Sequence, residues 1–320
     1  MHKPKVTVLM PAFNAAEYIA EAIASVLGQS FTDFELLIIN DGSIDNTIHA
    51  IQQFNDPRIR LLEQQRKGIV IALNNGLSAA SGCYIARFDA DDICLPQRLQ
   101  KQVEFLDKNP EYVLAGCDAE YIAETGEHLF NFSCASHTHD EIMQQLYLEC
   151  PFIHSGVMYR KDAVLKAGGY PVYAHNFEDH LLWIQLADRG QYYNIPERLI
   201  KVRFNPGSAT IDERWRGRRF AQLKKDIIRQ GFATQKEGDE LLSIIKNQDV
   251  QKIKKGSYYA LCGKKFLLNN HQPPKARQHL AKAIHYYPLR FDNYALYMLS
   301  FFPQSIIHWL HRRLDNTEKA

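Results

Sequence analysis

The sequence predicts an α/β fold with a mostly parallel sheet and helices on both of its faces. Over roughly the first 110 residues, short apolar runs alternate with stretches of helical spacing. The runs are apolar throughout, which is typical of parallel strands buried on both faces. A length of 320 residues with 46% hydrophobic residues is enough for a sizeable core. We therefore expect a parallel sheet in the N-terminal part.

The elements are expected in a regular order. The first four strands are predicted over residues 5–10 (ending at Pro11), 35–39, 59–62 and 84–88. The intervening helices are predicted over residues 17–27, up to Phe54, and over 69–78, and a further helix is predicted to begin near Pro96. Later come strands at 113–117 and 156–159 and a helix at 179–189. From residue 215 the pattern is helical, with breaks expected at Gly256, Pro273 and Pro288.

Charge divides the chain into two parts. Residues 1–213 contain 17 Lys and Arg against 28 Asp and Glu, whereas residues 214–320 contain 21 against 8. Such an asymmetry predicts a domain of residues 1–213 and a basic, mostly helical region of residues 214–320 with an anionic partner. The basic region also mixes cations with aromatic residues. This suits an anionic membrane surface, although packing in a helical bundle with an aromatic core is the favoured interpretation for most of these residues, with membrane contact expected from the last thirty.

Several classes of protein are not expected. The six cysteines form no CxxC pair, which favours free thiols in a reducing compartment over disulfides or a zinc site. The N-terminus before the first strand is short and polar, unlike a secretion signal. No apolar run approaches the roughly 18 residues of a spanning helix. No recognised nucleic-acid motif accompanies the positive charge. A cytoplasmic protein, peripheral at most to the membrane, is expected.

An acidic run follows the fourth strand. Asp89 and Asp91 are two residues apart in an extended chain, so both side chains point to one face. Two carboxylates aimed at one point suit Mg²⁺ or Mn²⁺, which leave other coordination positions to phosphates and water. The alternative is that Asp91 or Asp92 caps the helix expected near Pro96.

Two other strands also end in polar residues, at 11–14 and 40–43. Ligands of parallel α/β sheets bind beyond the carboxyl ends of the strands, so the three ends are expected to meet in one crevice. There Asp41 could accept a hydrogen bond from the N–H of a uracil ring. Turn formation and helix capping are the alternative for this segment.

A second acidic pair, Glu178 and Asp179, precedes a predicted helix about ninety residues later. A carboxylate that projects into the crevice could remove a proton from an attacking hydroxyl. Ordinary placement at a helix N-terminus, where the helix dipole favours negative charge, is the alternative.

Six motifs in this order resemble those of the family 2 glycosyltransferases, which have the GT-A nucleotide-diphospho-sugar transferase fold. They are Pro11 to Asn14, Val26 to Ser30, Asn40 to Ser43, Gly68 with Asn74, Asp89 to Asp92, and Glu178-Asp179 followed by Leu182-Trp183. The resemblance covers residues 4–213.

The resemblance implies an inverting, metal-dependent transfer of a sugar from a UDP-sugar to a hydroxyl. Asp91 would bind the Mn²⁺ or Mg²⁺ ion, Asp179 would be the general base, and Glu178 would shape the acceptor pocket beside it. Asp92 is left for the helix cap. The nucleotide-sugar site would comprise Pro11, Ala12, Phe13, Asn14, Asp41, Gly68, Asp89, Ala90 and Arg203.

The sequence departs from the family pattern at Asn205. Many relatives have a histidine here that helps to bind the metal or diphosphate, and an amide oxygen is a weak ligand. Arg203 could compensate by contacting phosphate, or it could form a surface salt bridge. His154 fits the segment that faces the acceptor, although a satisfied core histidine is the favoured interpretation.

The expected partners are a UDP-sugar and a glycan or lipid-linked acceptor of lipopolysaccharide or capsule synthesis, at the inner face of the cytoplasmic membrane. The run from Gly82 to Arg87 is similar to that of lipooligosaccharide N-acetylglucosaminyltransferases, which makes UDP-GlcNAc the preferred donor, with UDP-Gal, UDP-Glc and UDP-GalNAc close behind. A sugar-phosphate nucleotidylyltransferase would need a Gly- and Arg-rich loop after the first strand, and residues 11–14 do not provide one. A catalytically silent nucleotide-sugar-binding module is the remaining alternative.

Overall fold

The structure, a computed structural model, describes residues 3–208, 211, 216–247 and 250–307. The chain forms two compact units. The first comprises residues 1–120, 132–202 and 221–242, and the second residues 121–131, 203–220 and 243–320. The domain boundary expected at residue 213 stays a prediction.

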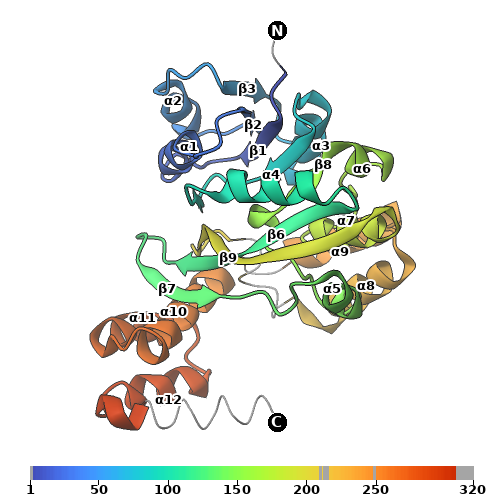
Figure 1. The fold of residues 1–320 in the computed structure, drawn as a ribbon. Helices are drawn as coiled ribbons and strands as arrows, with labels where there is room; N and C mark the ends of the chain where they lie inside the picture. Colours follow the sequence, from blue (N-terminus) through green and yellow to red (C-terminus); the bar gives the residue numbers. More distant parts are fainter. Residues whose placement is uncertain (1–2, 209–210, 212–215, 248–249, 308–320) are drawn as a thin grey trace. The chain divides into compact units, whose positions relative to one another are not determined.

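Within the described residues, nine strands form a single sheet with the order β3-β2-β1-β4-β8-β6-β9-β5, and β7 pairs with β6 (Figure 1). Neighbouring strands from β3 to β4 are parallel, whereas β8 is antiparallel to β4 and to β6. The strands are β1 (Val6–Ala12), β2 (Phe34–Asn40), β3 (Ile59–Glu63), β4 (Tyr84–Arg87), β5 (Ile93–Cys94), β6 (Tyr112–Ile122), β7 (His128–Phe132), β8 (Met158–Arg160) and β9 (Gln191–Arg203). The predicted parallel α/β architecture is confirmed for the N-terminal part.

Helices connect the parallel strands as predicted. In α1, the buried residues Ile19, Ala22, Ile23 and Val26 recur at helical spacing and form the face that packs inward. Helix α3 packs against β1 and β2, and α1 contacts α2 and β5. The helices up to residue 246 are α1 (Ile19–Leu27), α2 (Thr47–Gln52), α3 (Ile69–Ala79), α4 (Arg98–Lys108), α5 (His139–Gln145), α6 (Lys161–Lys166), α7 (Glu178–Leu186), α8 (Gly217–Gln230) and α9 (Gln235–Lys246).

The ends of β1, β2 and β4 lie at one edge of the sheet. Ala12 of β1 pairs with Asn40 of β2, and Leu9 of β1 pairs with Arg87 at the end of β4. The strand β1 was expected to stop at Pro11 but continues to Ala12. Since β4 pairs with β1 only as far as Leu9, the missing N–H of Pro11 is tolerated there. The three polar segments that follow these strands therefore share one edge, as predicted.

Arg98, a fully buried residue of α4, holds the end of β4 in place. Its Nη2 donates to the backbone carbonyls of Arg87 at 2.7 Å and Val157 at 3.2 Å, and its Nε donates to Gln102 Oε1 at 3.1 Å. Gln102 in turn donates to the carbonyls of Ala115 and Gly156. These bonds fix α4 against β4, β6 and the segment that precedes β8, because unpaired buried carbonyls would be costly.

In the second unit, α10 (Val250–Leu268), α11 (Pro273–Tyr286) and α12 (Phe291–Leu299) pack together. The helix break expected at Gly256 is wrong, since α10 runs through it. A Cβ at Gly256 would lie 2.2 Å from Tyr287 Cε2, and one at Gly263 would lie 2.6 Å from Leu280 Cγ. Both glycines therefore serve the close packing of α10 with the chain of α11 and its end. Among the described residues, no helix has the length and apolar character required to cross a bilayer.

We predict that Arg98→Met lowers the free energy of unfolding by about 2 to 4 kcal/mol, because it removes the donor to the buried Arg87 carbonyl. Urea unfolding of the variant measures this change. The control is Lys108→Met, an exposed change on the same helix, for which an effect below about 0.5 kcal/mol is expected. Equal effects of the two substitutions would contradict the anchoring role of Arg98.

Candidate active site

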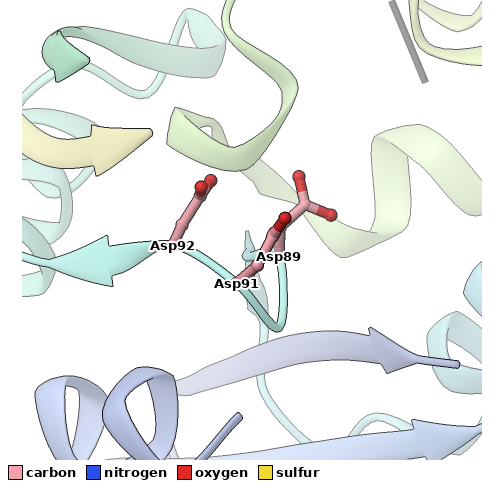
Figure 2. Close-up of side chains that lie close together, drawn as sticks. All are labelled: Asp89, Asp91 and Asp92. Carbon is pink, nitrogen blue, oxygen red and sulfur yellow. The ribbon is translucent and has the colours of Figure 1, made fainter. Parts of the chain in front are cut away.

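Three carboxylates come together in the turn between β4 and β5 (Figure 2). One ligand oxygen from each of Asp89, Asp91 and Asp92 lies within 4.8 Å of the other two. Hard oxygen donors at this spacing fit a single Mg²⁺ or Mn²⁺ ion. The predicted role of Asp91 in metal binding thus has a suitable set of donors around it.

The expected helix-capping role of Asp92 is wrong. The N-cap residue of α4 is Gln97, whose side chain makes no capping hydrogen bond, and the N–H of Leu99 in the first turn donates to Gln29 Oε1 at 3.1 Å. Asp92 is instead buried directly before β5, which was not expected from the sequence. The short strand moves the start of α4 away from the acidic run and leaves the turn as a separate feature.

Asp89 is held by two neighbours. Its backbone N–H donates to Ser155 Oγ at 3.0 Å, and its carboxylate forms an ion pair with Arg87. Arg87 is 2% exposed. Burial on its own would lower the pKa of Arg87, but the charge of Asp89 raises it, with a further contribution from Asp92. A permanent positive charge therefore lies beneath the acidic turn.

Asp41 is buried at the end of β2 and organises the loop after β3. Its Oδ1 accepts hydrogen bonds from Gln64 Nε2 at 2.7 Å and from the N–H of Lys67 at 2.8 Å, and its Oδ2 accepts from the N–H of Gly68 at 2.8 Å. Gly68 has φ +91° and is the N-cap residue of α3. A carboxylate oxygen has two lone pairs, so Oδ2 keeps the capacity for a second donor.

The loop after β1 is joined to the loop after β2. Asn14, with φ 48°, donates from its backbone to Ser43 Oγ at 3.0 Å and accepts from the N–H of Ile44 at 2.9 Å. Phe13 is partly exposed, and the guanidinium of Arg66 lies 4.3 Å from its ring centroid. A half-open aromatic ring at a strand end suits the stacking of a flat ligand. Three other residues predicted for this site are buried: Pro11, Ala12 and Ala90.

Glu178 and Asp179 form the first turn of α7, whose N-cap residue is Phe177 without a capping side chain. Burial raises the pKa of the Glu178 carboxyl above its usual range, and the adjacent Asp179 raises it further. Asp179 Oδ1 accepts from the N–H of His180 at 2.8 Å. The thiol of Cys150 lies 3.8 Å from Asp179 Oδ2. The pair is therefore an asymmetric one, in which Glu178 retains its proton to a higher pH than an exposed glutamate.

Arg87 interacts electrostatically with both the acidic turn, through Asp89 and Asp92, and Glu178. Its charge opposes the upward shift in the pKa of Glu178, while the charges of Asp89 and Asp92 raise the pKa of Arg87. Such electrostatic coupling requires Glu178 and the acidic turn to belong to one region of the first unit.

His154 belongs to a buried network of ring side chains. Its Nε2 is 3.1 Å from Tyr170 Oη, which lies 3.2 Å from Tyr159 Oη. Burial and the charge of Arg87 hold the pKa of His154 well below its usual range, so its ring is neutral. This geometry accords with the satisfied histidine that was the favoured interpretation, and an acceptor contact of His154 stays a prediction.

Arg203 and Asn205 lie in the second unit. Arg203 is buried and its Nη1 donates to the carbonyl of Glu124 at 2.9 Å and to that of Ala123 at 3.4 Å. The side-chain oxygen of Asn205 accepts from the N–H of Gly207 at 2.7 Å. Both groups thus have local structural contacts, and their roles toward phosphate or metal stay predictions.

Comparison with known proteins decides the family. The glycosyl transferase family 2 model matches residues 7–168. The chain belongs to glycosyltransferase family 2. Among relatives of this glycosyltransferase, the Bacillus subtilis (strain 168) protein named glycosyltransferase EpsE is 35% identical over 207 residues, which cover 62% of this chain and 73% of the relative. The amylovoran biosynthesis glycosyltransferase AmsE of Erwinia amylovora is 29% identical over 238 residues, covering 72% and 87%.

Solved structures bear out the predicted GT-A fold. Residues 1–349 of Staphylococcus aureus TarS in complex with UDP-GlcNAc superpose with a TM-score of 0.56 at 15% identity, covering 97% of this glycosyltransferase and 92% of that TarS fragment. The mannosyltransferase PcManGT of Pyrobaculum calidifontis, in complex with GDP-Man and Mn²⁺, gives a TM-score of 0.55 at 18% identity, covering 98% and 85%. Family membership decides against the nucleotidylyltransferase alternative.

Sequence reasoning on this glycosyltransferase missed three contributors to the site. Arg87 was read only as part of a motif, Ser155 was read as part of an acceptor-side segment, and Cys150 was regarded as incidental. A cation inside an otherwise apolar strand was the available signal for Arg87. Nothing in the spacing of Ser155 and Cys150 pointed to Asp89 and Asp179.

The raised pKa of Glu178 predicts a pH dependence of stability. A carboxyl whose pKa is raised by folding makes its full contribution to the free energy of unfolding below about pH 4. This contribution is lost as the pH rises through the raised pKa. Between about pH 5 and pH 8, the free energy of unfolding should therefore fall more in the parent than in Glu178→Gln. Urea unfolding at several pH values measures the difference.

The control for this comparison is Glu149→Gln, which changes an exposed glutamate near the same site. It should leave the pH profile of the parent unchanged. Parallel profiles for the parent and Glu178→Gln would show that Glu178 titrates like an exposed carboxyl.

Proposed function

We propose that this family 2 glycosyltransferase transfers a sugar from a UDP-sugar to a hydroxyl of a glycan or lipid-linked acceptor, with inversion, in cell-surface polysaccharide synthesis. The observation that carries the proposal is the cluster of Asp89, Asp91 and Asp92, coupled through buried Arg87 to the Glu178-Asp179 pair. A displacement at a sugar phosphate needs stabilisation of the departing diphosphate and removal of a proton from the attacking hydroxyl. A cation site would supply the first, and a separate carboxylate pair would supply the second.

The donor would lie along the shared strand edge. Phe13 would stack on the base, Asp41 would accept from its N–H through Oδ2, and Asp89 would bind the ribose hydroxyls. Support comes from the half-open ring of Phe13 and the second lone pair of Asp41 Oδ2. The sugar nucleotides in the TarS and PcManGT structures are UDP-GlcNAc and GDP-Man. UDP-GlcNAc is the preferred donor, in line with the Gly82 to Arg87 run.

Asp91, with Asp89 and Asp92 beside it, would hold Mn²⁺ or Mg²⁺. When bound, the ion supplies Lewis-acid stabilisation of charge on the departing diphosphate. Arg87 adds fixed positive charge below the turn and keeps the Asp89 carboxylate in place. The chain thereby prepares a site in which negative charge can accumulate on the leaving group.

Asp179 would act as the general base. Its carboxylate would take the proton of the acceptor hydroxyl while that oxygen bonds to the anomeric carbon from the face opposite the diphosphate. The bond from the anomeric carbon to the diphosphate breaks in the same displacement, and UDP leaves with the bonding electrons. Glu178, which keeps its proton to a higher pH, would position the acceptor by donating a hydrogen bond.

Membrane proximity is part of the proposal. The relative AmsE is named for amylovoran biosynthesis, and this name supports a role in polysaccharide assembly here. A lipid-linked acceptor would place the enzyme peripherally at the inner face of the cytoplasmic membrane.

Removing the metal-binding carboxylate tests the first half of the site. With a panel of UDP-sugars and Mn²⁺, Asp91→Asn should lower UDP release roughly 10- to 100-fold and raise the Mn²⁺ concentration needed for half-maximal activity. The matched control is Asp140→Asn, at an exposed position in the first turn of α5. An unchanged Mn²⁺ requirement in Asp91→Asn would contradict the assignment.

Removing the base tests the second half. Asp179→Asn should lower transfer by about 10² to 10⁴ while UDP binding, measured by calorimetry with Mn²⁺, stays within about twofold. Glu178→Gln should retain more activity than Asp179→Asn. The reverse order would assign the base to Glu178, and UDP binding without transfer in the parent, with every donor and acceptor tried, would favour the silent binding module.

A further inference from the structure

The C-terminal helices of the second unit form a core of their own. Tyr258, Cys262 and Phe266 of α10 pack with Leu280 of α11. Helix α12 contributes its inner face, where Asn293 is buried and Leu296, Tyr297 and Leu299 pack against this core or beside it. The inner face of α12 therefore packs within its own unit.

The outer face of α12 is apolar as well, which an ordinary surface helix would not be. Phe291 is 79% exposed, Met298 60% and Phe301 59%. The remaining exposed large apolar residues of this segment are Leu289, Tyr294, Phe302 and Ile306. We call these seven residues the α12 face.

Most of the α12 face follows helical spacing. Residues 291, 294, 298 and 301 succeed one another at intervals of three or four, so their side chains line one side of the helix and its extension. Contiguous exposed apolar surface of this kind marks an interaction site, in contrast to single exposed apolar residues. Figure 1 shows α12 after α11 at the C-terminal end of the described chain.

The C-terminal helices carry net positive charge in their sequence. Between residues 243 and 307 the sequence has ten Lys and Arg but two Asp. Arg277 lies with its guanidinium carbon 4.7 Å from the ring centroid of Phe301 and donates to the carbonyl of Ser300. Arg290 adjoins Phe291 and pairs with Asp292. Cations next to aromatic rings match the boundary between lipid headgroups and acyl chains.

We propose that the α12 face docks on an anionic lipid bilayer. The apolar side chains would enter the headgroup boundary, while the surrounding Lys and Arg would attract anionic headgroups. A helix face with exposed Phe and Met side chains, in a segment of net positive charge, suits a deformable anionic surface. Among the described residues no helix could span the bilayer, so α12 would lie in its surface plane.

The inference deepens the proposed function, on which it rests for the lipid-linked acceptor. Docking would bring the enzyme to the surface where such an acceptor resides. The docking itself involves none of the residues of the donor site. Vesicle binding is therefore measured without donor or metal, so that it succeeds or fails independently of sugar transfer.

The test is co-sedimentation of the full chain with vesicles. Phosphatidylcholine vesicles are compared with vesicles in which about one third of the lipid is phosphatidylglycerol. The parent should bind the anionic vesicles more strongly, and added NaCl should weaken that binding. The triple variant Phe291→Ser, Met298→Ser and Phe301→Ser should bind at least about tenfold more weakly.

A matched control separates this face from apolar exposure in general. The control triple variant Leu148→Ser, Leu165→Ser and Phe232→Ser changes exposed apolar residues of the first unit and should bind like the parent. Thermal unfolding checks that both triple variants remain folded, as expected for exposed positions.

Three outcomes would overturn the proposal. They are no binding of the parent to anionic vesicles, equal binding by the α12-face variant, and equal weakening by the control variant. Light scattering on the same proteins adds a further decision. A dimer of the parent that becomes a monomer in the α12-face variant would assign the face to a second copy of the chain instead of a bilayer.

Discussion

The hydrogen bond from Arg98 to the Arg87 carbonyl is the interaction on which the site depends most directly. It places a guanidinium beneath the last residue of β4, so the chain leaves the sheet at a fixed point and direction. The side chain of Arg87 then turns toward Asp89. Two arginines eleven residues apart thus have separate roles. Arg98 holds the backbone at the start of the turn, and Arg87 holds the carboxylate of Asp89.

Neighbouring carboxylates repel one another, so a cluster of them is stable only if a nearby positive charge offsets this repulsion. Here the opposing charge is buried beneath the acidic turn and lies within electrostatic range of Glu178 as well. Burial, with a further contribution from the same cation, lowers the pKa of His154, so the ring network with Tyr170 is part of the same electrostatic balance. The charges of the acidic turn, the protonation of Glu178 and the neutrality of the nearby rings are consequently linked, so a change in one would alter the others.

Local patterns predicted the parallel half of the fold well because β1, β2 and β4 are mostly apolar and the helices between them are periodic. They predicted the acidic turn for the same reason, since it follows directly from a strand end. They failed where the outcome depended on distant contacts. Asp92 was assigned to a helix that begins later, and Gly256 was taken for a break although Tyr287 packs against it. Contacts between residues far apart in the chain leave no trace in spacing.

The two glycines of α10 have a geometric consequence for everything after them. Hydrogen atoms at Gly256 and Gly263 set how closely the end of α11 and its Leu280 approach α10, and α12 packs on both helices. A methyl group at either position would push α11 away from α10, and this shift would change the tilt of α12. In the docking proposed above, the tilt of α12 would set the depth at which each aromatic ring enters the bilayer, so two glycines outside the α12 face would influence membrane contact.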